Sequence, residues 1–369
     1  MARAFRFRCY GLTAEQATRS TAWWGATRFV WNWFLDQRKQ FYEATGRRLK
    51  HGEISAQLPA MKAMFPFLRE VHSQVLQNLL QVQETAFERF LAGESGYPNW
   101  KSKRDEVFSF SWPQGFELNG DTVYLPKFGW VRFRKSRDIE GRISRVSLKF
   151  DRGFHVTFTC EVPKPEPLAP AGSSLGLDFG CEETYADSAG GFHRFPVATV
   201  AELGLEARWQ RILARKKPGS TRWRRVRQLL GKLALKISSR VQDYRHKLTT
   251  WLVESQDWVV VEKLGLLSMV QKASSGVSRL LLAGGHGETV RQLQYKADWT
   301  GRRLVEAPAA YSSQRCSCCG HTAKANRVSR SRFQCERCGY SVHADTNAAV
   351  NHWKFGAEFV GAGLAPNQA

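Results

Sequence analysis

Residues 316–351 read CSCCGHTAKANRVSRSRFQCERCGYSVHADTNAAVN, a stretch with two Cys-x-x-Cys-Gly turns followed by an acidic helix start. The glycine after each cysteine pair allows the backbone to turn so that its amide groups face the sulfur atoms. Four thiolates in a tetrahedral array suit zinc, and a closed four-sulfur set indicates a structural ion rather than a catalytic one. The stretch therefore predicts a zinc site with the ligands Cys316, Cys319, Cys335 and Cys338.

A further thiol, Cys318, lies inside the first turn and could shift the choice of ligands by one position. The glycine directly after Cys319 favours Cys316 and Cys319. Between the two turns residues 321–333 are basic, which suits a segment lying against a phosphate backbone. The cysteines of the apolar runs elsewhere are interpreted as small core residues, namely Cys9, Cys160 and Cys181.

The composition points to a nucleic-acid partner. The chain has 369 residues, enough for two or three domains, and a hydrophobic content of 43% that can fill real cores. Its formal net charge of +22 favours a polyanion, because each phosphate neutralised by Lys or Arg releases counterions. A membrane surface is the rival, but no segment approaches the ~20 apolar residues of a span, and the start lacks the apolar core of a signal peptide. We expect a cytoplasmic protein without a membrane partner, in which thiols stay reduced.

The first 165 residues predict a small β-barrel with a helical insertion. Residues 4–10 alternate apolar and basic side chains as a strand does, and residues 107–163 contain several short strand-like runs. Between them lie helical stretches from Thr13, at 53–65 and at 71–93, the first opened by a capping box of Thr13 and Gln16. Their aromatic residues are mainly expected in the core, with a few exposed ones able to stack on bases. The Pro-rich residues 163–174 are the predicted linker.

The helical region 202–250 carries a run of cations without acids from Ala207 to Arg227. An ordinary solvated helix alternates charge sign, so this run favours phosphate contact over a neutral surface. Together with the basic segment after Tyr97-Pro98, it supplies the predicted backbone contacts, which are Lys101, Lys103, Arg208, Lys216, Lys217, Arg222, Arg224 and Arg225.

Three acids stand where a catalytic site is expected. Asp178 interrupts the apolar strand LGLDFG, Glu262 ends the apolar strand WVVVE, and Asp345 begins the helix after the second cysteine turn. Each has a plain alternative, such as a helix N-cap for Asp345. Together they give the order of acids in an RNase H-like fold, where they converge at one end of the sheet. Clustered carboxylates repel one another unless cations lie between them, and two Mg²⁺ ions at such a site support phosphodiester hydrolysis.

The chain resembles the TnpB family of transposon-encoded RNA-guided DNA endonucleases, which are related to compact type V CRISPR effectors. The resemblance spans nearly the whole chain and rests on motifs in a fixed order. They are FRFRCY (5–10), RFVWNWFLDQR (28–38), YPNWKSK (97–103), GLDFG (176–180), VVVEKL (259–264), LQYKADWTGRRL (293–304), SSQRCSCCG (312–320) and HADTNAA (343–349).

The resemblance implies a multidomain chain of mixed α+β and α/β type, with catalytic Asp178, Glu262 and Asp345 binding Mg²⁺ or Mn²⁺. The implied domains are a wedge β-barrel (1–12 and 104–165), a helical recognition domain (13–103), a RuvC nuclease domain of RNase H-like fold (172–312 and 343–358), a zinc-ribbon insert (313–342) and a C-terminal tail (359–369). The family implies a guide RNA from the transposon end and a double-stranded DNA target beside a short motif, with the guide choosing the sequence. The resemblance also implies a bacterial, nucleoid-associated protein, and we expect a monomer bound to its RNA.

Side chains that read the flanking motif are expected in the first 125 residues, and Gln74, Gln77 and Asn78 have suitable donors and acceptors. An ordinary helix surface is the alternative for each of them. The chain departs from the family pattern at Glu182-Glu183 and after Met269, where Gly285-His286-Gly287 replaces a usual tryptophan. Three rival functions remain open: a nuclease-silent RNA-guided repressor, a transposase that joins strands, and a general zinc-ribbon binder that needs no guide.

Overall fold

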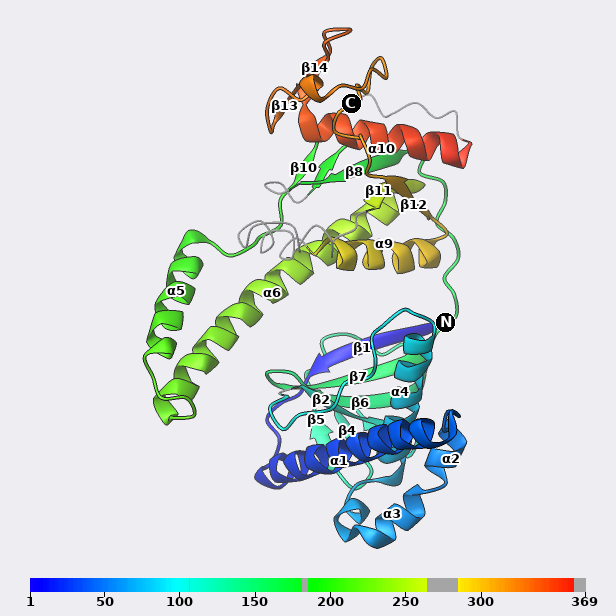
Figure 1. Cartoon of the computed structure of the whole chain (residues 1–369), viewed down its shortest axis with the longest axis vertical. Coiled ribbons are helices and arrows are strands. Elements are labelled where there is room, and N and C mark those ends of the chain that lie inside the picture. Colours follow the sequence, from blue (N-terminus) through cyan, green and yellow to red (C-terminus); the bar gives the residue numbers. More distant parts are fainter. Residues whose placement is uncertain (106, 181–184, 264–284, 362–369) are drawn as a thin grey trace. The chain divides into compact units, whose positions relative to one another are not determined.

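The computed structural model describes residues 1–105, 107–180, 185–263 and 285–361. The chain divides into two compact units, Met1–Lys164 and Pro165–Ala369 (Figure 1), which are described separately. The predictions for Cys181, for Glu182-Glu183 and for the segment between Met269 and Gly285 lie outside the described residues. Among the described residues, none of the helices combines the length and the apolar character that crossing a bilayer requires.

Two antiparallel sheets form the strand part of the first unit. The larger has the strand order β1-β7-β6-β2, and the smaller has the order β3-β4-β5. Phe5 pairs with Phe158 in the larger sheet, and side chains along these strands alternate between core and solvent. The strands are β1 (Ala2–Arg8), β2 (Phe108–Trp112), β3 (Glu117–Asn119), β4 (Thr122–Leu125), β5 (Gly129–Arg132), β6 (Arg142–Phe150) and β7 (Phe154–Glu161).

These strands do not form the closed barrel that the sequence predicts. The two sheets are joined by one bridge, Cys9 to Phe133, and no pairing links β2 to β3 in the part of the chain that the structure describes. The helical insertion covers the apolar face in place of further strand pairing. Trp23 of the first helix packs edge-on against Phe110 and Phe128, with ring centroids 5.6 Å apart in each case.

The helices of the first unit share this core with the sheets. The capping box of Thr13 and Gln16 opens α1 as predicted, and Gly46 ends it with a φ of 63°, which favours glycine. The predicted helix at 53–65 is instead two short helices, with Ala56 as the C-cap of the first and Gln57 as the N-cap of the second. The elements are α1 (Ala14–Thr45), α2 (His51–Ser55), α3 (Leu58–Met64), η1 (Pro66–Arg69) and α4 (Ser73–Leu91).

The second unit is built on a five-stranded mixed sheet of order β10-β9-β8-β11-β12. β8, β11 and β12 run parallel, whereas β9 and β10 return antiparallel. Helix α10 covers one face, and α6 and α9 cover the other (Figure 1). The elements are β8 (Ser174–Phe179), β9 (Tyr185–Asp187), β10 (Phe192–His193), α6 (Thr221–Ser255), β11 (Trp258–Lys263), α9 (His286–Thr300), β12 (Arg303–Pro308) and α10 (Ala344–Val360).

Two glycines let α10 approach this sheet closely. A Cβ added to Gly176 of β8 would lie 2.3 Å from the carbonyl oxygen of Ala349, and one added to Gly356 of α10 would lie 2.2 Å from Val260. Real side chains do not tolerate such distances. The GLDFG motif thus has a packing reason for its first glycine, and the contact fixes the depth of α10 on the sheet.

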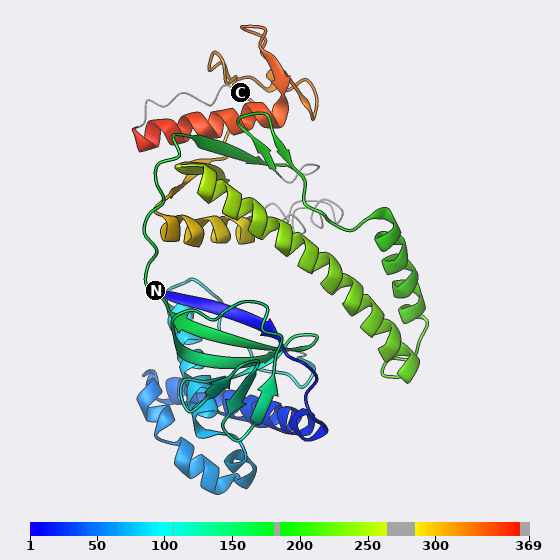
Figure 2. The same cartoon turned by 180° about the vertical axis from the view of Figure 1, so that it is seen from behind.

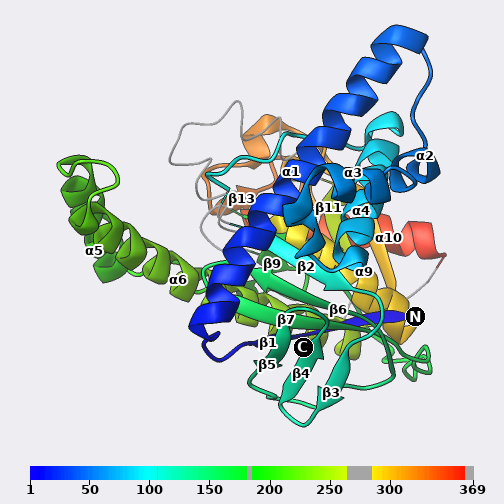
Figure 3. The ribbon, with the colours of Figure 1, turned by 90° about the horizontal axis from the view of Figure 1, so that it is seen from below.

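A helical hairpin of α5 (Val200–Ala214) and α6 extends away from the sheet, as Figures 2 and 3 show from two further directions. Ser220 caps α6 by accepting a hydrogen bond from the backbone of Trp223. Residues 312–343, which hold the four predicted zinc ligands, are called the cysteine segment. This segment contains η2 (Lys324–Asn326), β13 (Arg332–Gln334) and β14 (Ser341–His343). β14 runs directly into α10, and His343 is the N-cap of that helix.

Candidate active site and metal centre

Asp178 and Glu262 meet at the carboxyl end of two neighbouring parallel strands. They occupy β8 and β11, with alternation that turns both toward the face covered by α10. The Glu262 carboxylate accepts a hydrogen bond of 3.0 Å from the backbone N–H of Phe179. Both side chains are buried, with 8% and 7% of their surface exposed. Two carboxylates so buried need a cation or protons to balance their charge.

The third acid, Asp345, lies in the first turn of α10 near the same strand ends. Burial and the neighbouring Asp178 raise the pKa of Glu262 to about 8, and Asp345 adds to that rise. Burial and Asp178 likewise raise the pKa of Asp345, although cations of the cysteine segment oppose the change. The structure thus brings the three predicted acids close enough to repel one another.

A histidine that the sequence analysis missed completes the tightest cluster. The ring of His352 on α10 is 1% exposed, and its Nε2 lies 3.3 Å from Oδ1 of Asp178. Asp178, Glu262 and His352 each present a ligand atom within 4.8 Å of the others. The spacing could have revealed it, because His352 follows Asp345 by two helical turns and so occupies the same face of α10.

An arginine from the cysteine segment reaches Asp345. The Arg327 guanidinium donates to Oδ1 of Asp345 over 3.4 Å and to the backbone oxygen of Arg330 over 3.1 Å. The basic character of this segment was predicted to serve phosphate contact, yet one of its cations pairs with an acid of the site. The contact is partly exposed, so an incoming cation or phosphate can compete for either partner.

A neutral histidine supports the site from the other face of the sheet. His286, the first residue of α9, donates from Nε2 to the backbone oxygen of Glu262 over 3.3 Å. The Tyr185 hydroxyl donates to its Nδ1 over 3.0 Å. Burial lowers the pKa of His286 to about 4, so the ring is uncharged at neutral pH. The departure from the family pattern at Gly285-His286-Gly287 therefore fills a position that ties α9 to β11.

The four predicted zinc ligands form a second cluster, with all sulfur atoms within 4.8 Å of one another. Cys316 and Cys338 are 3.7 Å apart, and Cys319 and Cys335 are 3.6 Å apart. A tetrahedral zinc ion with four thiolates at ~2.3 Å requires sulfur atoms about 3.8 Å apart, so the spacing fits zinc. The glycines after the two pairs have φ values of 76° and 74°, which explains the residue type there. Cys318 is exposed and not a member of the cluster.

Two asparagines of α10 hold the cysteine segment. The Asn347 side chain accepts from the backbone N–H of Ser317 over 2.9 Å and donates to the oxygen of Arg315 over 2.8 Å. Asn351 donates to the backbone oxygens of Ser312 and Arg315. One helix therefore carries Asp345 and His352 toward the sheet while its asparagines grip the cysteine turns.

Comparison with known proteins identifies the family. InsQ of Escherichia coli (strain K12), whose name describes an RNA-guided DNA endonuclease, is 33% identical over 346 residues, covering 89% of this chain and 86% of InsQ. The chain belongs to the TnpB family. A Streptomyces pristinaespiralis relative with a similar name is 30% identical over 383 residues, covering 99% of this chain and 92% of the relative. TnpB-like protein L79 of Acanthamoeba polyphaga mimivirus is 26% identical over 142 residues, which cover 37% of this chain and 27% of L79.

Family models match three parts of this TnpB-family chain: "Cas12f1-like, TNB domain" at 286–352, "Probable transposase" at 157–273 and "Helix-turn-helix domain" at 1–47. Residues 1–47 hold β1 and the single long helix α1, so they do not form a helix-turn-helix. The fold is similar to that of Cas12f1, solved in complex with its guide RNA and target DNA. The TM-score is 0.56 at 11% identity, over 95% of this chain and 98% of Cas12f1.

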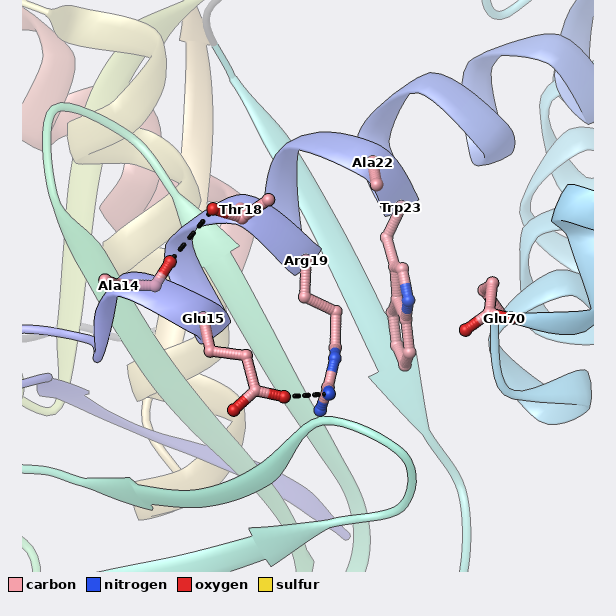
Figure 4. Close-up of a pocket in the computed structure, with 7 residues that line it drawn as sticks. All are labelled: Ala14, Glu15, Thr18, Arg19, Ala22, Trp23 and Glu70. Carbon is pink, nitrogen blue, oxygen red and sulfur yellow. Dashed lines mark hydrogen bonds and ion pairs between the residues drawn. The ribbon is translucent and has the colours of Figure 1, made fainter.

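The predicted nucleic-acid contacts of the first unit differ in their surroundings. Gln77 is exposed on α4, whereas Gln74 and Asn78 are half-buried. Lys103 is exposed, but the Lys101 ammonium lies 4.5 Å from the ring centre of Trp31, and burial lowers its pKa. A shallow groove elsewhere in this unit runs along α1 and contains none of these residues; Figure 4 shows its lining, with Arg19 paired to Glu15 and Trp23 beside them.

The predicted contacts of the second unit follow the α5–α6 hairpin. Lys216 is half-buried beside the turn, and the others are exposed: Arg208, Lys217, Arg222, Arg224 and Arg225. They are spread along α5, the turn and the first part of α6, where a phosphate backbone would be accessible. Their role in binding stays a prediction.

Proposed function

We propose that the chain is an RNA-guided DNA endonuclease. It would bind a guide RNA from the transposon end, recognise a short motif beside a double-stranded target and cut the target. Membership of the TnpB family supports this, as do relatives named for the same activity and the net charge of +22. The observation that carries the proposal is the gathering of Asp178, Glu262 and Asp345 at one end of the sheet.

The proposed catalytic centre uses the three acids as ligands of Mg²⁺ or Mn²⁺. The residues fit such ions, because carboxylate oxygens are the ligands that hard cations prefer. Burial and the neighbouring Asp178 and Asp345 raise the pKa of Glu262, and a bound cation would balance the negative charge of this group of carboxylates. When bound, a pair of ions activates water and stabilises the leaving oxygen of a phosphodiester. Glu262 is oriented by the Phe179 amide, and Asp178 by His352. Arg327 can turn from Asp345 to a phosphate oxygen once Asp345 takes up a cation.

The domains follow from this proposal. Residues 172–312 and 343–358 would form a RuvC-type nuclease domain of RNase H-like fold, and residues 313–342 a zinc-ribbon insert held by the four cysteines. In the first unit, residues 1–12 and 104–165 would be the wedge and residues 13–103 the recognition helices. Residues 359–369 would form a tail. Zinc would be structural, because its four protein ligands leave no position for substrate.

The experiment begins with the protein purified from cells that carry its flanking genomic DNA. Sequencing the bound RNA identifies the guide, and a plasmid library with randomised flanks then tests motif and cleavage together. We expect cuts only beside guide-matched sequence, and none with Asp178→Ala.

Three outcomes would contradict the proposal. Guide-dependent binding without cleavage by the wild type would indicate a repressor. Joining of donor ends would indicate a transposase. Binding that ignores the guide would indicate a general zinc-ribbon binder.

A further inference from the structure

His352 lies in the acidic centre beside the three acids that are proposed as metal ligands. Its ring is 1% exposed, and its Nε2 faces Oδ1 of Asp178 at 3.3 Å. One ring nitrogen of His352 and one oxygen each from Asp178 and Glu262 lie within 4.8 Å of one another, and all three residues are buried. A buried imidazole beside two carboxylates is either a hydrogen-bond partner or a metal ligand. The two roles make different predictions.

The packing of α10 fixes this ring in place. Asp345, Ala349, His352 and Gly356 fall on one stripe of the helix, at the spacing of residues that share a face. The stripe is pressed onto the sheet by the two close glycine contacts, at Gly176 and at Gly356. The backbone of His352 is therefore held at a fixed depth over β8. A rigidly held position is what a metal ligand requires, because its donor atom must lie in the correct geometry before the ion binds.

The distances suit shared coordination of one ion. Two ligand atoms in neighbouring positions of an octahedral ion, each at ~2.1 Å, lie about 3 Å from one another. The separation of 3.3 Å between Nε2 and Oδ1 is close to that value. In the ion-free protein Nε2–H donates to the Asp178 carboxylate, and coordination of an ion by Nε2 would require the other neutral tautomer, in which that proton is on Nδ1. Asp345, outside this tight trio, remains available for a second ion.

We propose that His352 Nε2 is a protein ligand of the ion held by Asp178 and Glu262. It shifts the preference of that position from Mg²⁺ toward Mn²⁺. The reason is ligand chemistry: Mg²⁺ favours oxygen donors alone, whereas imidazole nitrogen strengthens binding of transition metals. The inference rests on the proposed metal site. It concerns the identity of one ligand and of the preferred ion.

Pulsed electron paramagnetic resonance tests the ligand directly, with Mn²⁺ as the probe. The full chain is purified with its RNA and its zinc, then titrated with Mn²⁺. We expect nitrogen couplings from one bound imidazole in the wild type. His352→Gln should abolish them, although its amide can still donate to Asp178. His343→Asn is the matched control: it removes the imidazole at the N-cap of α10 but keeps a side chain that can cap the helix, so the couplings should persist.

Metal affinity gives a second readout, independent of activity. In competition titrations His352→Gln should weaken Mn²⁺ binding by at least about tenfold and Mg²⁺ binding by much less, so the Mn²⁺-to-Mg²⁺ affinity ratio falls. Mn²⁺ bound to the wild type without nitrogen coupling would overturn the inference and leave the metal site standing. Absence of tight Mn²⁺ binding in both the wild type and Asp178→Asn would remove the proposed metal site as well. The wild-type spectrum decides even if His352→Gln does not fold.

Discussion

The backbone N–H of Phe179 donates to the Glu262 carboxylate over 3.0 Å, so the residue directly after one acid orients another acid across a strand boundary. This bond lowers the pKa of Glu262, but burial and Asp178 outweigh it and hold that pKa at about 8. Asp178 and Glu262 are therefore positioned by the sheet itself, and their mutual repulsion is present before any ligand arrives.

The raised pKa of Glu262 predicts how stability depends on pH in protein stripped of divalent ions. The folded state keeps a proton on Glu262 up to about pH 8, whereas the unfolded chain releases it near the ordinary value of 4.5. The stability that Glu262 contributes is thus fully present below the unfolded value and is lost as pH rises through about 8, a loss of roughly 4 to 5 kcal/mol. Chemical unfolding between pH 5 and 8 measures this, and Glu262→Gln should flatten the slope. Equal slopes for the two proteins would contradict it.

The four-cysteine cluster predicts a separable structural role for zinc. Cys335→Ser should lose the zinc, unfold the cysteine segment and reduce cleavage at least about tenfold, because α10 loses the turns that hold its asparagines. The transition of the first unit should not change. Metal analysis by mass spectrometry and thermal unfolding measure these effects. Cys318→Ser is the control, since this exposed thiol lies outside the cluster, and it should keep its zinc. Full cleavage by metal-free Cys335→Ser would refute the role.

Arg327 is expected to contact a phosphate of the target during cleavage. It becomes available when Asp345 binds a metal ion and releases the guanidinium. Arg327→Ala should slow cleavage about tenfold to a hundredfold, the effect of losing one charge-assisted hydrogen bond to a phosphate. Guide and target binding should change little. Single-turnover cleavage and equilibrium binding separate the two effects. Arg332 is an exposed arginine of the same segment, and its side chain donates to Gln334. The control variant Arg332→Ala should behave like the wild type. Equal rates for both variants would exclude a role for Arg327.

Gly176→Ala should destabilise the second unit, because the new methyl group would meet the carbonyl oxygen of Ala349 at 2.3 Å. Overpacking of this kind costs about 1–3 kcal/mol, and displacement of α10 would also reduce cleavage. Gly204→Ala in α5 is the matched control: nothing lies within 4 Å of its added Cβ, so we expect a small stabilisation of the helix. Denaturant unfolding of the two variants is the measurement. A Gly176→Ala protein as stable as the wild type would show that α10 adjusts freely.

The α5–α6 hairpin should contribute electrostatic affinity without sequence preference. Changing Arg222, Arg224 and Arg225 to Gln should weaken RNA binding and lower the slope of log affinity against log salt, by up to about one for each lost phosphate contact. Fluorescence anisotropy across a salt series measures the slope. A triple variant of exposed cations already paired to carboxylates, Lys39, Arg142 and Lys247, serves as the control. A common slope for both triple variants would assign the hairpin another role.

Residues whose role is written in local pattern could be predicted from the sequence. The two cysteine turns carry their spacing and glycines, and the cap at Thr13 carries its partner three residues later. Asp178 and Glu262 are conspicuous because a charge interrupts or ends an apolar strand. Parallel pairing then brings them together.

Residues whose role depends on packing could not be found in this way. The spacing of His352 from Asp345 places both on one face of α10, but only the close glycine contacts show that this face lies against β8. Arg327 is one cation among several until the segment folds back on Asp345. The barrel prediction was wrong because strand runs do not reveal that Trp23 and its helix would cover the apolar face.

The double attachment of α10 has a consequence for how the protein responds to its surroundings. One side of the helix carries Asp345 and His352 toward the sheet, and the other side holds the cysteine turns through Asn347 and Asn351. Rotation of α10 about its own axis would break both sets of contacts together. We therefore expect zinc starvation to disable the molecule as completely as magnesium depletion, although the four predicted zinc ligands form a cluster separate from that of Asp178 and Glu262. Cleavage would then require both zinc and magnesium, because the sites of both ions depend on the position of α10.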